Sequence, residues 1–163
     1  MEWVGHEKHF DRELFVLDAS SSDDIPDSFA VPCPYFACLI VWDACLVSDV
    51  VIRAVANKLL RAGCVYICCW GPDCSRVHDC FDTVELMLRP DGPWAMSTWH
   101  KDEPLCEALW FLLACAAPDD AFFGGCRASI GLTVGSQAWA AEVRKALTFP
   151  AEYSAAFLAS EGD

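Results

Sequence analysis

The sequence predicts an α/β protein with an open, doubly wound, mostly parallel sheet of about four strands and helices on both faces. Two observations support this prediction. Short, continuously apolar runs recur along the chain, as is typical of strands that are covered on both faces. Between them lie stretches with apolar residues at helical spacing, so strand and helix alternate. This alternation is typical of Rossmann-like folds, and the expected strand order is 2-1-3-4.

The first strand and helix units have the clearest boundaries. The first expected strand covers residues 35–42 and ends abruptly at Asp43. Ser48 is the expected cap of an amphipathic helix that Gly63 ends, and a second apolar run at residues 64–70 follows directly. Two strands joined by a helix in this way are expected to be parallel, with a right-handed crossover.

The rest of the chain repeats the pattern. A second helix is expected from Asp73, followed by a strand at residues 94–99. A third helix begins after Asp102, which is its expected cap. The last strand is expected around residues 128–134, and Ser136 is the expected cap of a final amphipathic helix.

The length of 163 residues is typical of one domain, and we expect a single α/β domain over residues 1–163. Residues 1–34 are expected to form an irregular N-terminal arm, because only a short apolar run stands out in them. Residues 35–148 form the expected α/β core. A short helix and a tail are expected at residues 149–163.

Composition and charge exclude several classes of partner. The chain has 55% hydrophobic residues and a net charge of −13. Phosphate binding needs clustered basic residues, and only Arg144 and Lys145 are adjacent, so nucleic acid is excluded. The same charge disfavours an anionic membrane surface. The apolar runs also stop short of the roughly 18 residues that a membrane-spanning helix needs.

The eleven cysteines are expected to be reduced. Residues 1–9 are too polar for a secretory signal peptide, so we expect a cytoplasmic protein. Free cysteines in apolar patterns are usually buried as small hydrophobic residues. The cysteines expected to be buried in this way are Cys38, Cys64, Cys68, Cys69, Cys106 and Cys115.

Acidic and histidine side chains follow the expected strands at their carboxyl ends, which is where open parallel sheets bind ligands. Carboxylates and imidazoles transfer protons in hydrolysis and group transfer. His100 precedes two acids, which would hold its ring in one tautomer. The candidate catalytic residues are Asp43, Asp73, His100 and Glu103.

Aromatic residues stand at the same edge. Trp42, Trp70 and Trp99 end expected strands, where they would wall a cleft for a flat ligand or close the core. Cys74 lies in the first turn of the second helix, where the helix dipole would lower its pKa, and His78 follows one turn later. The candidate ligand-binding residues are Trp42, Trp70, Cys74, His78, Trp99 and Asp102.

Each candidate also has a purely structural explanation. Asp73 and Asp102 are suited to capping helices, and a histidine at a strand end is often hydrogen-bonded within the core. The tryptophans would then only close the core. Asp43 ends a strand with no helix directly after it, which makes it the better functional candidate.

Several well-known motifs are missing. The chain has no Gly-x-Gly-x-x-Gly after the first strand, no P-loop, no Gly-x-Ser-x-Gly and no paired zinc knuckles. The segment at residues 69–74 has tryptophan, glycine and proline in the order of the thioredoxin motif, but four residues separate its cysteines instead of two. The sequence therefore assigns no metal, and the cofactor is unknown.

Two functions of different classes remain open. In the first, the protein binds a small nucleotide- or sugar-like molecule at the strand ends and acts as a hydrolase or group-transfer enzyme. In the alternative, it is a non-catalytic acidic regulator or inhibitor that docks on a basic protein partner. Exposed acidic pairs such as Asp23-Asp24 and Asp119-Asp120 would then make the contact.

Overall fold

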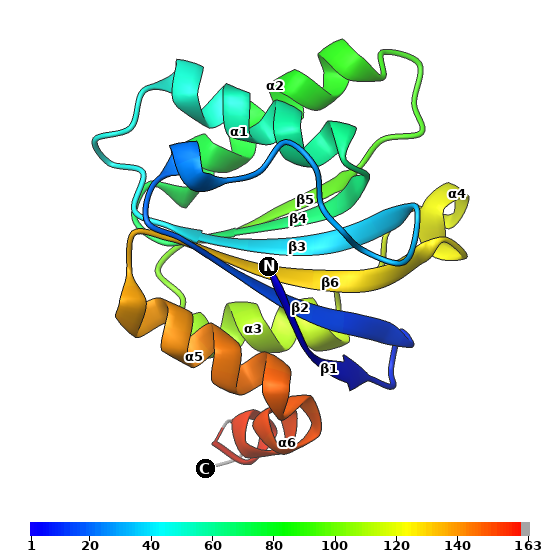
Figure 1. The fold of residues 1–163 in the computed structure, drawn as a ribbon, viewed down its shortest axis with the longest axis vertical. Coiled ribbons are helices and arrows are strands. Elements are labelled where there is room, and N and C mark those ends of the chain that lie inside the picture. Colours follow the sequence, from blue (N-terminus) through cyan, green and yellow to red (C-terminus); the bar gives the residue numbers. More distant parts are fainter. Residues whose placement is uncertain (161–163) are drawn as a thin grey trace.

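A computed structural model describes residues 1–160, which form a six-stranded mixed sheet with helices on both faces (Figure 1). The strand order is β1-β2-β6-β3-β4-β5. The first pair, β1 and β2, is antiparallel, and every other neighbouring pair is parallel. The strands are β1 (Glu2–Glu7), β2 (Arg12–Ala19), β3 (Tyr35–Trp42), β4 (Cys64–Trp70), β5 (Met96–His100) and β6 (Cys126–Val134).

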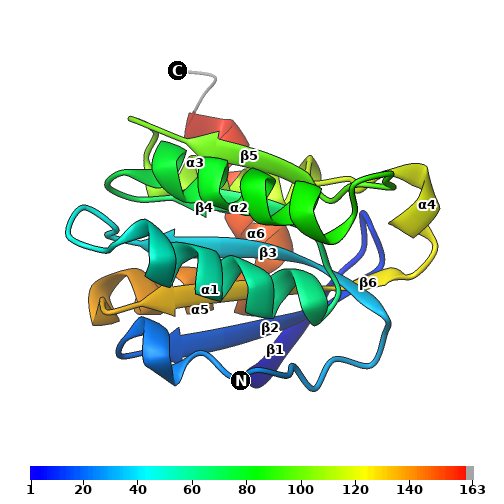
Figure 2. The same cartoon turned by 90° about the horizontal axis from the view of Figure 1, so that it is seen from above.

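The helices bury two separate apolar cores, one on each face of the sheet. One core packs α1 and α2 against the sheet, and the other packs α3 and α5. Figure 2 shows α1 and α2 running side by side along their face. The helical elements are η1 (Ser22–Asp24), α1 (Asp49–Arg61), α2 (Cys74–Leu88), α3 (Leu105–Ala114), α4 (Asp120–Phe123), α5 (Gln137–Thr148) and α6 (Pro150–Ser160).

The sheet is mostly parallel as expected, but the predicted strand order 2-1-3-4 is wrong. That order would place β5 beside β3, whereas β5 pairs with β4 and β6 lies beside β3. The reason is that α1 and α2 cover the same face, so two right-handed crossovers carry the chain in one direction across the sheet. Helix α3 lies on the opposite face, as α5 does, and from α3 the chain returns to β6.

The expectation of an irregular N-terminal arm is wrong for β1 and β2, which add two strands to the predicted sheet. Strand β2 pairs in parallel with β6 and is buried on both faces. Leu14 and Val16 pack under the α3 and α5 side, whereas Phe15 and Leu17 pack under the α1 and α2 side. Its continuous apolar run covers only residues 14–17, and so short a run does not distinguish a strand from a buried helix turn.

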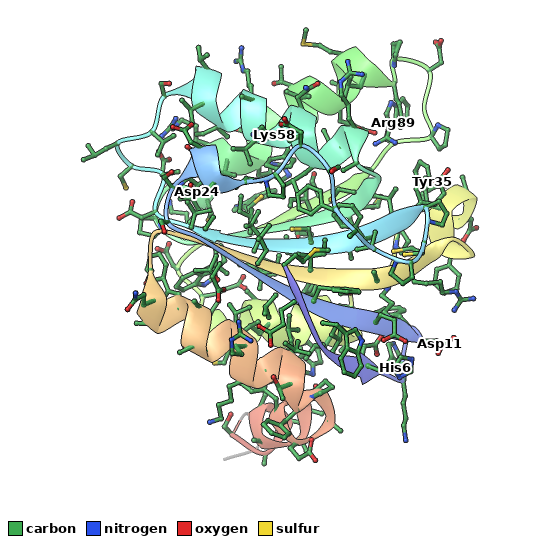
Figure 3. The ribbon with its side chains drawn as sticks, in the orientation of Figure 1. His6, Asp11, Asp24, Tyr35, Lys58 and Arg89 are labelled. Carbon is green, nitrogen blue, oxygen red and sulfur yellow. The ribbon has the colours of Figure 1, made fainter. Side chains whose placement is uncertain are left out.

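The segment that follows β2 is the irregular part of the arm. It runs from residue 20 to residue 34, includes η1, and lies on the same face as α1 (Figure 1). Lys58 of α1 holds this segment in place (Figure 3). Its Nζ donates a hydrogen bond to the Ile25 carbonyl at 2.8 Å and lies 3.2 Å from the Asp27 carboxylate. This segment therefore runs along the α1 side of the sheet from the carboxyl end of β2 to the amino end of β3.

The chain ends in α6, which confirms the expected short helix; residues 161–163 of the expected tail lie outside the described part. Helix α6 packs on α3, α5 and β1 and has no buried residue. No helix in residues 1–160 is both long and apolar enough to cross a membrane.

Burial of the cysteines follows the apolar pattern in the strands but not in α3. Cys38, Cys68 and Cys69 are fully buried, and burial raises the pKa of Cys68 to about 12. Cys64 is also fully buried. The expectation is wrong for Cys106, which is half-buried, and for Cys115, which is exposed. Cys106 lies on the side of α3 that faces away from the sheet, and Cys115 lies at the C-terminal end of the helix.

Thiol reactivity tests this arrangement. We expect a disulfide reagent at pH 8 to modify Cys45 and Cys115 first, because these are the exposed thiols in residues 1–160. Cys38 and Cys69 should react only at the rate of unfolding, because burial raises their pKa and blocks access. Mass mapping of the modified sites measures this.

The double variant Cys45→Ser, Cys115→Ser is the control and should lose the fast phase. Rapid labelling of Cys38 in the folded protein would contradict the placement of β3 at the centre of the sheet.

Candidate functional site

A crevice opens at the carboxyl edge of the sheet, where two neighbouring strands send the chain to opposite faces. Strand β3 leads to α1 on one face, and its neighbour β6 leads to α5 on the other (Figure 1). Ligands of open α/β sheets bind at this kind of topological switch point. The sequence predicted a site at this edge of the sheet, but its expected strand order did not place β3 and β6 side by side.

The crevice has a volume of about 680 Å³. That volume falls within the range of small-molecule sites. Its walls come from the segments that follow β2, β3 and β6 and from the first turn of α5. The lining residues are Ser20, Ser21, Ser22, Trp42, Asp43, Cys45, Leu46, Val47, Val134, Gly135, Ser136 and Trp139.

Asp43 supplies the carboxylate of this crevice. It follows β3 directly and is exposed, and its Oδ1 accepts a hydrogen bond from the Cys45 backbone N–H at 3.1 Å. A hydrogen bond from the Cys45 thiol to Asp43 also raises the pKa of Cys45. The carboxylate is therefore oriented by its own loop and faces solvent at the mouth of the crevice.

The opposite wall is fixed by the turn between β6 and α5. Ser136 caps α5, because its Oγ accepts the Trp139 N–H at 3.3 Å. Gly135 adopts a φ of +77°, and its N–H donates to the Ala19 carbonyl at 2.9 Å. That conformation favours glycine, and the bond holds the ends of β2 and β6 together. The expected cap at Ser136 is confirmed.

A smaller cavity of about 250 Å³ adjoins the crevice on the α5 side of the sheet. Ser20, Gly135 and Ser136 line both spaces. Thr133 lines only the smaller one, and sequence reasoning missed it. The available signal was a hydroxyl residue near the end of an otherwise apolar strand. The remaining lining residues are Asp18, Ala19, Gln137 and Ala140.

A third cavity of about 340 Å³ is lined by several other predicted site residues. It is lined by Trp70, Gly71, Pro72, Asp73, His100, Lys101, Asp102, Glu103 and Trp139. Trp139 also lines the crevice and packs edge-on against Trp70, with ring centroids 5.3 Å apart. The two spaces are therefore neighbours on either side of Trp139.

His100 is held firmly in this third cavity. Its side chain is buried, its Nδ1 lies 2.7 Å from Glu103 Oε2, and its Nε2 lies 3.3 Å from Thr98 Oγ1. The ring also packs against Phe111. Because both ring nitrogens have partners within the protein, the placed imidazole has no free nitrogen for a substrate.

The expectation that the candidate catalytic residues share one cleft is not met. Asp43 lies in the crevice, whereas Asp73, His100 and Glu103 lie in the third cavity. Trp99 lies in neither, because successive side chains of β5 point to opposite faces of the sheet. His100 faces α3, while Trp99 packs on His78 of α2, with centroids 4.6 Å apart.

His78 belongs to a polar cluster between α2 and the edge strand β5. Its Nδ1 lies 3.1 Å from Asp79 Oδ1, and its Nε2 lies 3.0 Å from Ser97 Oγ. That order resembles a serine, histidine and aspartate triad. Ser97, however, donates its hydroxyl proton to Asp82 Oδ1 at 2.6 Å, so His78 is not positioned to accept that proton.

Three further expectations are corrected by local geometry. Cys74 is 2% exposed, and burial raises its pKa instead of the helix start lowering it. Asp102 does not cap α3, because it has a φ of +61° and Pro104 occupies the cap position. Asp73 occupies the cap position of α2, but its carboxylate makes no capping bond and pairs with Arg76 instead.

Arg76 connects α2 to the wall of the crevice. Its guanidinium donates to the carbonyls of Ala44 and Val47 at 2.6 and 2.9 Å. It also contacts the carboxylates of Asp49 and Asp73, each at 2.7 Å. Arg76 therefore attaches the segment after Asp43 to the first turns of α1 and α2.

Residues 14–148 match the family described as domain of unknown function DUF7684. The chain belongs to this family. The DUF7684 span includes β3 to β6, all of β2 except its first two residues, the crevice and the two neighbouring cavities, whereas β1 and α6 lie outside it. Neither a curated protein nor a solved structure matches the chain.

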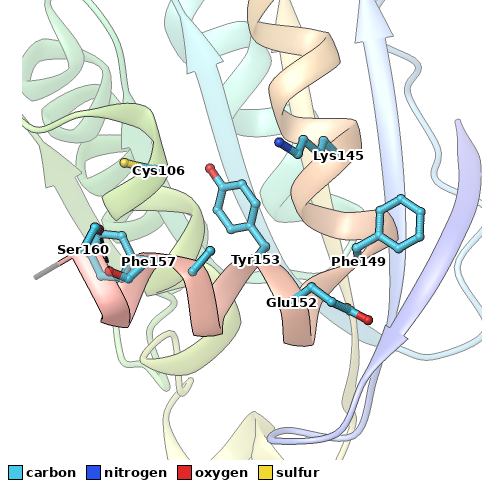
Figure 4. Close-up of a pocket in the computed structure, with 8 residues that line it drawn as sticks. Cys106, Lys145, Phe149, Glu152, Tyr153, Phe157 and Ser160 are labelled. Carbon is cyan, nitrogen blue, oxygen red and sulfur yellow. Dashed lines mark hydrogen bonds between the residues drawn. The ribbon is translucent and has the colours of Figure 1, made fainter.

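A further cavity of about 500 Å³ lies between α6 and the DUF7684 span (Figure 4). Tyr153 and Phe157 of α6 line it together with Cys106 of α3, and most of its wall is apolar. Lys145 and Glu152 bring charges of opposite sign. The lining therefore specifies no class of ligand.

The described part of the DUF7684 domain provides no obvious metal centre. In residues 1–160, no group of three or more histidine, cysteine, aspartate or glutamate side chains is arranged to hold a metal ion. The polar groups of the crevice are one carboxylate and several hydroxyls, which suit hydrogen bonding to a ligand.

Replacing Arg76 tests how the crevice wall is held. Arg76→Ala should lower Tm by a few degrees and increase amide hydrogen exchange in residues 43–48, because the carbonyls of Ala44 and Val47 lose their donor. The matched control is Arg53→Ala on the exposed side of α1, which should leave both measurements unchanged. Unchanged exchange in Arg76→Ala would contradict this role.

Proposed function

We propose that the protein binds a small, uncharged, hydroxyl-rich ligand of the sugar type in the crevice between β3 and β6. The observation that carries the proposal is the lining of that crevice. It contains the Asp43 carboxylate, several serine hydroxyls and the indole of Trp139, and no basic residue is among the described residues that line it.

The chemistry of these groups supports a sugar over a nucleotide. A carboxylate accepts hydrogen bonds from ligand hydroxyls, and such charge-assisted bonds are stronger than neutral ones. An indole offers an apolar surface to the flat side of a sugar ring. A phosphate group would meet Asp43 without a cationic partner, in a protein with a net charge of −13.

The proposal is limited to binding. The hydrolase or group-transfer interpretation depended on Asp43, Asp73 and His100 acting on one ligand, but Asp43 lies in a different cavity from Asp73 and His100. We place the binding activity in the cytoplasm. In residues 1–160, which include all eleven cysteines, seven thiols are buried, and a reducing compartment keeps thiols in that form.

Docking on a basic partner is the alternative function, and one residue of each acidic pair proposed for the contact has a structural role. Asp24 accepts hydrogen bonds from Ser21 and so closes the turn of η1 (Figure 3). Asp119 accepts the N–H of Ala121 at 2.9 Å and caps α4. These carboxylates therefore stabilise local structure, which leaves them less suited to a partner-specific role.

A binding screen tests the proposal. Thermal shift assays with glucose, galactose, mannose, the common nucleosides and the matching nucleotides should show stabilisation by at least one sugar, because a ligand that binds the folded state raises Tm. Nucleotides should bind no better than their nucleosides. If no sugar raises Tm and polylysine does, the alternative function is favoured.

Asp43→Asn gives the residue-level prediction. The amide keeps an oxygen for the Cys45 N–H, so Tm should stay the same, while sugar affinity should fall about tenfold because a charge-assisted hydrogen bond becomes neutral. Calorimetric titration measures the affinity. Asp91→Asn, in the exposed turn after α2, is the control and should bind like the unchanged protein.

A further inference from the structure

The small cavity beside Thr133 has no explanation in the fold alone. It lies between the ends of β2 and β6 and the first turn of α5, and it adjoins the crevice at Ser20, Gly135 and Ser136. Its volume of about 250 Å³ is below the usual size of a separate ligand site. The cavity is therefore suited to an extension of a ligand that already occupies the crevice.

Thr133 is the unusual residue of this cavity. It is 1% exposed, and its Oγ1 has no hydrogen-bond partner among the described residues. Buried hydroxyl groups almost always have a partner, and exceptions concentrate at strained or functional sites and where a water molecule or an ion binds. Its neighbours Leu132 and Val134 face the α1 side, so Thr133 faces α5, where the cavity lies.

The other polar groups of the cavity indicate a neutral partner. Asp18 lines it, and Arg144 lies 3.2 Å from this carboxylate and 2.9 Å from Glu2. Arg144 thus shares one positive charge between Asp18 and Glu2, so the two carboxylates keep a net negative charge that disfavours a bound anion. Gln137 adds an amide, and Ser20 adds a hydroxyl. Donors and acceptors in this mixture suit the hydroxyls of a sugar ring.

We propose that this cavity is a second subsite of the crevice, so that the protein selects ligands with two linked sugar units. The first unit occupies the crevice next to Asp43, and Thr133 forms a hydrogen bond with a hydroxyl of the second unit. Ser20 and Ser136 line both spaces and lie next to the linkage. This inference rests on the sugar binding proposed above.

The test compares monosaccharides with the disaccharides that contain them. Calorimetric titration of the full chain with glucose, galactose, maltose, cellobiose and lactose should show one disaccharide that binds at least about tenfold more tightly than its monosaccharide, which is the range of one or two added hydrogen bonds. Equal affinities for the two sizes would contradict the second subsite while leaving sugar binding intact.

Thr133→Val separates a ligand contact from a structural role. Valine has nearly the same shape and lacks the hydroxyl, so the disaccharide should bind about tenfold more weakly while monosaccharide affinity stays unchanged. Tm should stay the same or rise, because the removed hydroxyl has no partner in the protein. A clear fall in Tm with unchanged affinities would overturn the assignment.

Thr98→Val is the matched control. Thr98 also lies in a parallel strand, but its hydroxyl contacts His100 Nε2 at 3.3 Å. Its replacement should lower Tm and leave both affinities unchanged. If the unchanged protein binds neither monosaccharides nor disaccharides, both the proposed function and this inference are wrong. If it binds monosaccharides and disaccharides equally well, only this inference is wrong.

Discussion

The handedness of the strand-helix-strand connections determines where this protein can have a site. Because α1 and α2 pack on the same face, the chain moves in one direction from β3 through β4 to β5. It can return only over the other face, through α3. The return places β6 beside β3, with their following helices on opposite faces. The crevice exists because these two helices diverge.

The polar groups at this edge fall into two kinds. Some hold the scaffold: Arg76 joins α2 to the crevice wall, and Ser136 caps α5. Others have no structural partner to account for them, and Thr133 is the clearest example. Asp43 is intermediate, since it orders its own loop and still faces solvent. The proposed binding role rests on the groups that the scaffold does not use.

The two described parts of the chain outside the family span, β1 and α6, contribute no residue to the lining of the crevice or of the small cavity beside it. Strand β1 pairs on the outer side of β2, and α6 packs on α3 and α5. Lys145 belongs to α5 but faces the cavity under α6 instead of the crevice (Figure 4). The site proposed here therefore lies wholly within the DUF7684 span.

Local sequence determined the elements that bury apolar residues on both sides. The runs at residues 35–42 and 64–70 coincide with β3 and β4, and Gly63 with its positive φ ends α1 as its sequence predicts. Sequence also determined the edge of the sheet that bears Asp43. Apolar periodicity is a property of consecutive residues, so it can be recognised without knowledge of the fold.

Only the tertiary structure decided which of these residues meet. Strand order depends on which face each helix covers, and an apolar stripe on α1, α2 or α3 does not by itself indicate that face. That choice put Asp43 and His100 in different cavities and gave Thr133 a place beside the crevice. Residues distant in sequence come together only through packing between elements, and no local pattern records that packing.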